Sequence, residues 1–158
     1  MSKIKITIAD RPFLQRKGLA VLLNENADFV LLSEALSASE LVNQAKFYAP
    51  HLIIIDYTSV NYSLESLTLI VKKYPKAKLL AITDVQTNDV ISQALKTGVT
   101  SHLLKDCDQD EIVEAIYKTA NGEKFMCGKI VSDILQEKQT DFQEYTCEGL
   151  NITDREME

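Results

Sequence analysis

The chain has 158 residues, of which 46% are hydrophobic and 25% are charged, a composition typical of one folded domain with a smaller appendage. No apolar run approaches the roughly 18 residues of a membrane-spanning helix, and the chain opens on a strand pattern rather than a signal peptide, so we expect a cytoplasmic protein with no membrane partner. The formal net charge of −6 argues against a basic, DNA-binding surface.

The first half of the chain alternates between strand and helix patterns. A strand is predicted over Lys3–Ala9, followed by a helix whose first turn suits Pro12. A second strand is predicted over Phe29–Leu32 and a second helix over Ser39–Phe47. The unbroken apolar run Leu52–Ile55 then predicts a strand that is buried on both faces, as in a parallel sheet.

The second half repeats the alternation. The predicted elements are a helix over Leu64–Lys73, a strand over Lys78–Thr83, a helix over Asn88–Lys96, a strand over Ser101–Leu104 and a helix over residues 108–120. Five strand–helix units with short connections predict an α/β fold with a doubly wound, five-stranded parallel sheet and helices on both faces. The strand order expected for it is 2-1-3-4-5.

Polar residues stand where the predicted strands end. Asp10 follows the first strand, Asp56 the third and Lys105 the fifth, while Thr83 closes the fourth. In an open parallel sheet, ligands and chemistry collect at the carboxyl ends of the strands. Two acids, a lysine and a hydroxyl at one sheet edge therefore predict a phosphoryl-transfer or metal site.

These residues carry a resemblance to a known family. Together with the run Arg16–Leu19 and the segment Gly98–Lys105, the strand-end residues resemble the flavodoxin-like receiver domain of two-component response regulators of the NarL/FixJ (LuxR-type) branch. The resemblance implies that Asp56 is a phosphoacceptor for a sensor histidine kinase and that Thr83 and Lys105 bind the phosphoryl group. It also implies a signalling protein, not an enzyme, that works as a homodimer in transcription regulation.

A Mg²⁺ cofactor is also implied, held by Asp10, Asp56 and the backbone carbonyl of Thr58. The family usually has a second acid directly after the first strand, where this chain has Arg11. We expect the Arg11 guanidinium to replace the cation, pin Asp10 and Asp56, and weaken Mg²⁺ binding. The alternative is that Arg11 points into solvent beside a weakened metal site.

Further positions depart from the family pattern. Asp84 stands where a small residue is usual, and Asp106 stands where a proline is common, often after a cis peptide bond. His102 occupies the position of the aromatic switch residue, either as a pH-sensitive group or, as we favour, as a partly exposed structural histidine. Together these changes predict an atypical acidic pocket.

The domain boundaries follow from composition and resemblance. We predict a receiver domain over residues 1–122, a linker with a helix over residues 123–150, and the start of a helix-turn-helix DNA-binding domain over residues 151–158, where Thr153 and Glu156 have capping-box spacing. Residues 123–158 hold 4 basic and 9 acidic residues, so DNA binding is expected only through that missing domain. The three cysteines, odd in number and widely spaced, predict neither a disulfide framework nor a zinc site.

Three function classes stay open on sequence alone. The first is a phosphorylation-controlled receiver, and the second is a phosphorylation-independent pseudo-receiver that acts in dimerisation or docking. The third is a small phosphatase-like hydrolase, which is the weakest because the sequence offers no cap domain and no second catalytic acid near Asp56.

Overall fold

A computed structural model describes residues 3–128, 130 and 131 of the chain. Residues 3–127 belong to one compact unit, and Gly128, Ile130 and Val131 are the described residues of a second unit. The predicted linker helix, apart from Ile130 and Val131, and the predicted helix-turn-helix start at residues 151–158 lie outside the described residues. They stay predictions.

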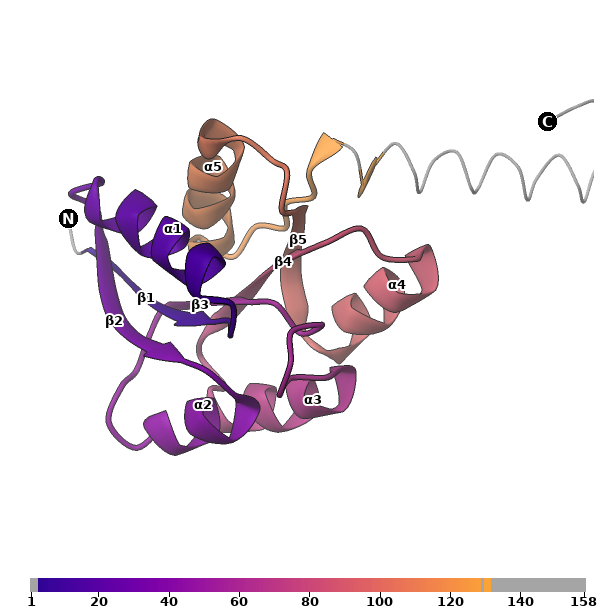
Figure 1. Cartoon of the computed structure of the whole chain (residues 1–158), viewed down its shortest axis with the longest axis horizontal. Helices are drawn as coiled ribbons and strands as arrows, with labels where there is room; N and C mark the ends of the chain where they lie inside the picture. The colour runs from indigo at the N-terminus through magenta and orange to yellow at the C-terminus, as the bar shows by residue number, and fades with distance from the viewer. Residues whose placement is uncertain (1–2, 129, 132–158) are drawn as a thin grey trace, which may run out of the picture. The chain divides into compact units, whose positions relative to one another are not determined.

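Within residues 3–127, five strands alternate with five helices (Figure 1). The strands are β1 (Ile4–Ala9), β2 (Phe29–Ala35), β3 (Leu52–Ile55), β4 (Lys78–Thr83) and β5 (Val99–Leu104). The helices are α1 (Phe13–Asn24), α2 (Ala38–Gln44), α3 (Leu64–Lys73), α4 (Asn88–Thr97) and α5 (Gln109–Ala120). Each strand and helix predicted between residues 3 and 120 is present, and most boundaries agree within two residues.

The five strands form one parallel sheet in the order β2-β1-β3-β4-β5. Helices α1 and α5 cover one face, and α2, α3 and α4 cover the other (Figure 1). The predicted fold class and strand order are therefore confirmed. This order brings the carboxyl ends of β1, β3, β4 and β5 to the same edge of the sheet, where the sequence places its polar strand-end residues.

Side-chain caps explain where several helices begin. The Ser37 hydroxyl accepts a hydrogen bond from the Glu40 amide, so α2 begins at Ala38, slightly before the predicted start at Ser39. Ser63 and Ser66 form a reciprocal capping box at the start of α3. At the C-terminal end of α4, Gly98 has φ +142, and a Cβ there would lie 2.7 Å from Val71 Cγ2. Only glycine fits this turn without displacing a neighbour.

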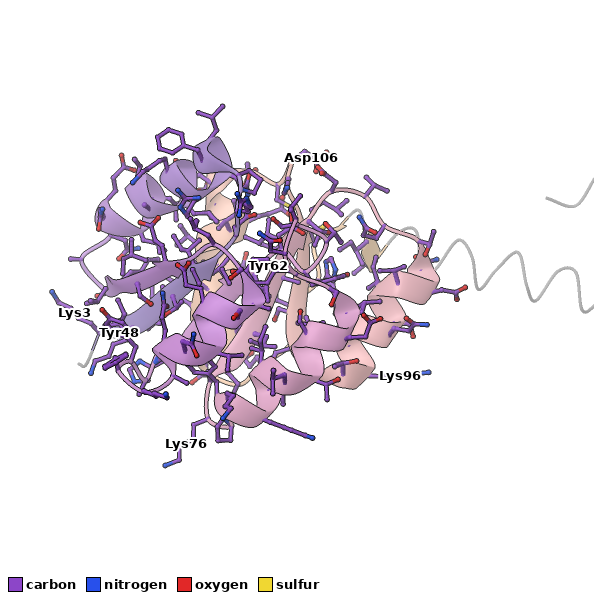
Figure 2. All side chains as sticks on the ribbon, turned by 60° about the horizontal axis from the view of Figure 1, so that its bottom comes forward. Lys3, Tyr48, Tyr62, Lys76, Lys96 and Asp106 are labelled. Carbon is purple, nitrogen blue, oxygen red and sulfur yellow. The ribbon has the colours of Figure 1, made fainter. Side chains whose placement is uncertain are left out.

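The core lies on both faces of the central strands. All four residues of β3 are buried, as the apolar run predicted. Tyr62 is buried as well and donates a hydrogen bond from its hydroxyl to the Ala35 carbonyl at 2.8 Å. Figure 2 shows Tyr62 in the middle of the view, whereas Lys3, Lys76 and Lys96 project from the margins.

A short segment after α5 runs beside the outer edge of β5. The His102 amide donates to the Phe125 carbonyl at 3.0 Å, and the Cys127 amide donates to the His102 carbonyl at 3.4 Å. Met126 forms the isolated parallel bridge with His102. These contacts make residues 125–127 part of the compact unit, which ends at residue 127.

Among residues 3–128, 130 and 131, no helix has both the length and the apolar character needed to cross a membrane.

Candidate phosphoryl-transfer site

The four strand-end residues are brought to one sheet edge by the parallel ladder. The Asp56 amide donates to the Ala9 carbonyl at 3.1 Å, and the Lys105 amide donates to the Thr83 carbonyl at 2.9 Å. Asp10, Asp56 and Thr83 are all buried. Burying two carboxylates costs free energy unless each is paired with a cation, hydrogen-bonded or protonated. The partners of each oxygen therefore determine which ligands the site can bind.

Both carboxylate oxygens of Asp56 have partners. Oδ1 accepts hydrogen bonds from the Thr58 amide at 2.9 Å and from the Thr58 hydroxyl at 2.5 Å. Oδ2 lies 2.8 Å from Lys105 Nζ, in an ion pair whose acid side chain is 2% exposed. The carboxylate is therefore held in a fixed orientation from both sides.

Lys105 is the cation of the site. Burial alone would lower the pKa of its ammonium group, but the hydrogen bond and charge of Asp56, together with the charges of Asp84 and Asp10, outweigh burial and raise it. The Asp84 carboxylate lies 3.7 Å from Lys105 Nζ, and its side chain is 79% exposed. Lys105 is thus charged at neutral pH and links the buried acid to the rim of the site.

Asp10 lacks a comparable partner. Its Oδ1 is buried without a hydrogen-bond partner among the described residues. Burial and then the Asp56 charge raise the pKa of Asp10 to about 6, against the opposing effects of Lys105, the Arg11 amide and the Ser59 hydroxyl. A buried carboxylate with a raised pKa and an oxygen that lacks a partner is suited to bind either a proton or a metal cation.

The expected role of the Arg11 guanidinium is wrong in this structure. The Arg11 side chain is exposed, and within the described part of the chain it forms no ion pair with Asp10 or Asp56. Its contacts are made by the backbone: the amide donates to the Ser59 hydroxyl at 3.2 Å, and the carbonyl accepts from Arg16 Nη1 at 2.7 Å. Lys105 holds the position next to Asp56 that the hypothesis gave to Arg11. The alternative, with Arg11 in solvent, describes the side chain correctly.

Thr83 is fully buried, and its hydroxyl donates to the Asp84 carbonyl at 2.7 Å. The hydroxyl is thus held by the loop that follows β4. The Asp84 carboxylate lies at the rim instead of inside the site, so the predicted extra negative charge is largely exposed to solvent.

His102 is not partly exposed, contrary to expectation, but fully buried. Its Nε2 lies 2.6 Å from the Tyr57 hydroxyl, and the two rings meet edge to face. Burial lowers the pKa of His102 to about 4 and, together with the Asp56 charge, raises that of Tyr57. Both groups are neutral at pH 7. The expectation did not include the Tyr57 side chain, which packs against the imidazole inside the core.

Several contacts of the site could not be read from the sequence. The Thr58 hydroxyl, the Ser59 hydroxyl and the Tyr57–His102 pair were not predicted; the available signal was the polar run Tyr57–Ser59 directly after Asp56. The described residues contain no cis peptide bond, so the turn at Asp106 is built from trans peptides.

The residues at this edge fit a Mg²⁺ ion. No group of three His, Cys, Asp or Glu side chains in the described part of the chain is arranged to bind a metal. Mg²⁺, however, is commonly bound by one or two carboxylates and several waters. The unpartnered Asp10 Oδ1, buried close enough to Asp56 for its charge to be felt, is the kind of oxygen that such an ion would satisfy.

Comparison with known proteins identifies the family of this chain. The model of the response regulator receiver domain matches residues 6–117. The chain therefore belongs to the response regulator receiver domain family, as the sequence predicted.

The individual proteins that match this chain have low sequence identity to it. The transcriptional regulatory protein LnrK of Bacillus subtilis (strain 168) is 29% identical, over 98% of this chain and 74% of LnrK. The crystal structure of a LuxR-family two-component response regulator from Aurantimonas sp. SI85-9A1 has a TM-score of 0.80 at 23% identity, covering 87% of this chain and 99% of that one. A structure of two RcsB dimers bound to two parallel DNAs has a TM-score of 0.77 at 18% identity, covering 96% of this chain and 85% of that one. At these identities the two solved structures support the fold.

Proposed function

We propose that this chain is the receiver of a LuxR-type transcriptional response regulator and that Asp56 accepts a phosphoryl group from a sensor histidine kinase. The observation that carries the proposal is the ion pair between Lys105 and the buried Asp56 at the carboxyl edge of the sheet, beside Asp10, whose Oδ1 has no partner among the described residues. Family membership and the name of LnrK support the wider role in transcription.

In the proposed reaction, a carboxylate oxygen of Asp56 attacks the phosphorus of a phosphohistidine. The new O–P bond makes an acyl phosphate, and the N–P bond breaks with its electron pair returning to the histidine nitrogen. Lys105 is placed to pair with the phosphoryl oxygens, because its Nζ already lies 2.8 Å from Asp56 Oδ2. The Thr58 hydroxyl has to release Oδ1 if that oxygen is the nucleophile.

Asp10, Asp56 and the Thr58 carbonyl are the groups we propose to hold Mg²⁺. When bound there, the ion would neutralise the charge of the transferring phosphoryl group. Because the Arg11 side chain is exposed and forms no ion pair with Asp10 or Asp56 within the described residues, we expect its guanidinium not to compete for this position. We therefore expect metal affinity to be set by Asp10 and Asp56, not by Arg11.

Thr83 is the proposed switch residue. For its hydroxyl to reach a phosphoryl oxygen, it must leave the Asp84 carbonyl that it contacts at 2.7 Å. That exchange would move the start of the loop between β4 and α4. The charge added at Asp56 would thereby change the surface that this loop presents.

The experiment is phosphorylation by acetyl phosphate with and without Mg²⁺, followed by intact-mass analysis. One added phosphoryl group is expected in the wild type, and none in Asp56→Asn. Asp84→Asn, which alters the exposed rim, serves as a matched control that keeps the reaction. A folded wild type that gains no phosphoryl group under any of these conditions would instead support the phosphorylation-independent pseudo-receiver.

We also propose a homodimer that contacts DNA through a helix-turn-helix domain beginning near residue 151. The structure of RcsB dimers on DNA supports this arrangement by its fold alone. Light scattering before and after phosphorylation tests it, with a concentration-dependent increase in mass as the expected result. As receiver domains are signalling modules, we propose no turnover activity for this chain.

A further inference from the structure

Two cysteines that are far apart in the sequence are both anchored to β5 in the fold. Cys107 follows β5, and its amide donates to the Leu104 carbonyl at 3.1 Å. Cys127 follows α5, and its amide donates to the carbonyl of His102 on the same strand. Both backbones are therefore fixed to the end of β5, and the Cys127 thiol is close enough to influence the pKa of Cys107. The whole of α5 lies between them in the sequence.

The two sulfur atoms differ in how accessible they are. Cys127 is 1% exposed, whereas Cys107 is half-buried and can be reached from solvent. Asp106, directly before Cys107, lies at the surface of this turn (Figure 2). Burial, followed by the neighbouring Cys127, raises the pKa of the Cys107 thiol to about 12. At neutral pH the Cys107 group is therefore a thiol, which reacts slowly.

We propose that Cys107 and Cys127 form a redox modification site, which closes to an intramolecular disulfide when the protein meets a peroxide. The Cys107 thiolate attacks one peroxide oxygen, the O–O bond breaks and a sulfenic acid forms. The Cys127 sulfur then attacks the Cys107 sulfur, the S–O bond breaks and water leaves. Overall, two thiols and one hydrogen peroxide give one disulfide and two waters.

The disulfide would act on the part of the fold that carries Lys105. It closes a ring over residues 107–127 that contains α5, and it ties the turn after Lys105 to the segment that pairs with His102. A link across a ring of this size restricts the unfolded chain strongly. The proposal does not depend on phosphorylation of Asp56.

The test treats the full chain with hydrogen peroxide, blocks the remaining thiols with iodoacetamide and maps the peptides without reduction. The expected result is a Cys107–Cys127 linked peptide, with Cys147 alkylated. Formation should be faster at pH 9 than at pH 7, because the thiolate is the reacting form. The oxidised protein should melt about 5–10 °C higher than the reduced protein, and dithiothreitol should reverse the shift.

Cys147→Ser is the matched control and should keep both the linked peptide and the shift. Cys107→Ser and Cys127→Ser should each abolish them, and the half-buried Cys107 provides the variant less disruptive to folding. The proposal is overturned if Cys147 supplies the partner, if the linkage joins two chains, if Cys107 is oxidised to a sulfinic acid without a linkage, or if no thiol is lost.

Discussion

The hydroxyl of Tyr57 lies 2.6 Å from Nε2 of His102, so the residue directly after Asp56 is joined to β5 inside the core. His102 in turn pairs through its backbone with Phe125 and Cys127. A continuous set of contacts thus leads from the site to the last part of the compact unit.

Tyr57→Phe removes the hydroxyl and leaves both ring nitrogens of His102 without partners, since Nδ1 already has none among the described residues. We expect a loss of about 1–3 kcal/mol in the free energy of unfolding, the usual cost of an unsatisfied buried polar group. Urea unfolding measures it. Tyr48→Phe, at an exposed ring near the margin of Figure 2, is the control and should change stability by less than about 0.5 kcal/mol. Equal effects of the two variants would contradict the prediction.

The Asp10 carboxyl should make stability fall as the pH rises. Its folded pKa of about 6 lies above the ordinary value of 3.8, so the folded state binds the proton more tightly. The stabilisation is fully present below pH 3.8 and is lost as the pH rises through 6. In metal-free buffer, Asp10→Asn should therefore be more stable than wild type at pH 8, by about 1–3 kcal/mol, and similar to it near pH 3.8.

Urea midpoints across this pH range, with chelator present, provide the measurement. His102 titrates in both proteins and cancels in the difference, since its lowered pKa concerns both alike. Adding Mg²⁺ should narrow the gap at pH 8, because only the wild type retains both carboxylates. A difference that does not vary with pH would mean that Asp10 is not the titrating group.

Arg11 and Lys105 should respond very differently to neutral substitution. Arg11→Ala removes an exposed guanidinium and should change stability by no more than about 0.5 kcal/mol. Lys105→Met leaves the buried Asp56 without its ion-pair partner and should cost about 1–3 kcal/mol. Thermal and urea unfolding in metal-free buffer compare the two. If Arg11→Ala were the more damaging change, the guanidinium would be acting as the cation after all.

Thr58 should contribute through its hydroxyl. Thr58→Ala removes one of the two donors to Asp56 Oδ1 and should lower the free energy of unfolding by about 1–2 kcal/mol, as expected for a hydrogen bond to a charged group. Thr58→Ser keeps the hydroxyl and should stay close to wild type. A serine variant as unstable as the alanine variant would show that the methyl group, not the hydroxyl, is the important part.

The sequence predicted the strands and the residues at their carboxyl ends because both follow from backbone patterns. The run Leu52–Ile55 is buried on both faces, so its length and position were evident. By contrast, the predicted second strand ended at Leu32, because Ser33 and Glu34 interrupt the apolar pattern. In the structure, β2 continues to Ala35. Ser33 finds partners in Thr7 and Gln44, which only the tertiary structure supplies.

The features that the sequence did not predict correctly share a physical cause, because each depends on the direction of a side chain or on its tertiary neighbours. Arg11 could reach the acids or the solvent, and no local pattern distinguishes these rotamers. His102 is buried against Tyr57, and no local pattern in the sequence brings these two residues together. Cys107 and Cys127 meet only because both are anchored to β5.

The bridge between His102 and Met126 also bears on how the sheet ends. β5 is an edge strand, and an uncovered edge is a template to which another chain can add. Here the chain occupies part of that edge itself, with both the amide and the carbonyl of His102 already bonded. A fragment ending at residue 122 would leave these groups open, so the few residues beyond α5 protect the folded receiver against aggregation through its own sheet.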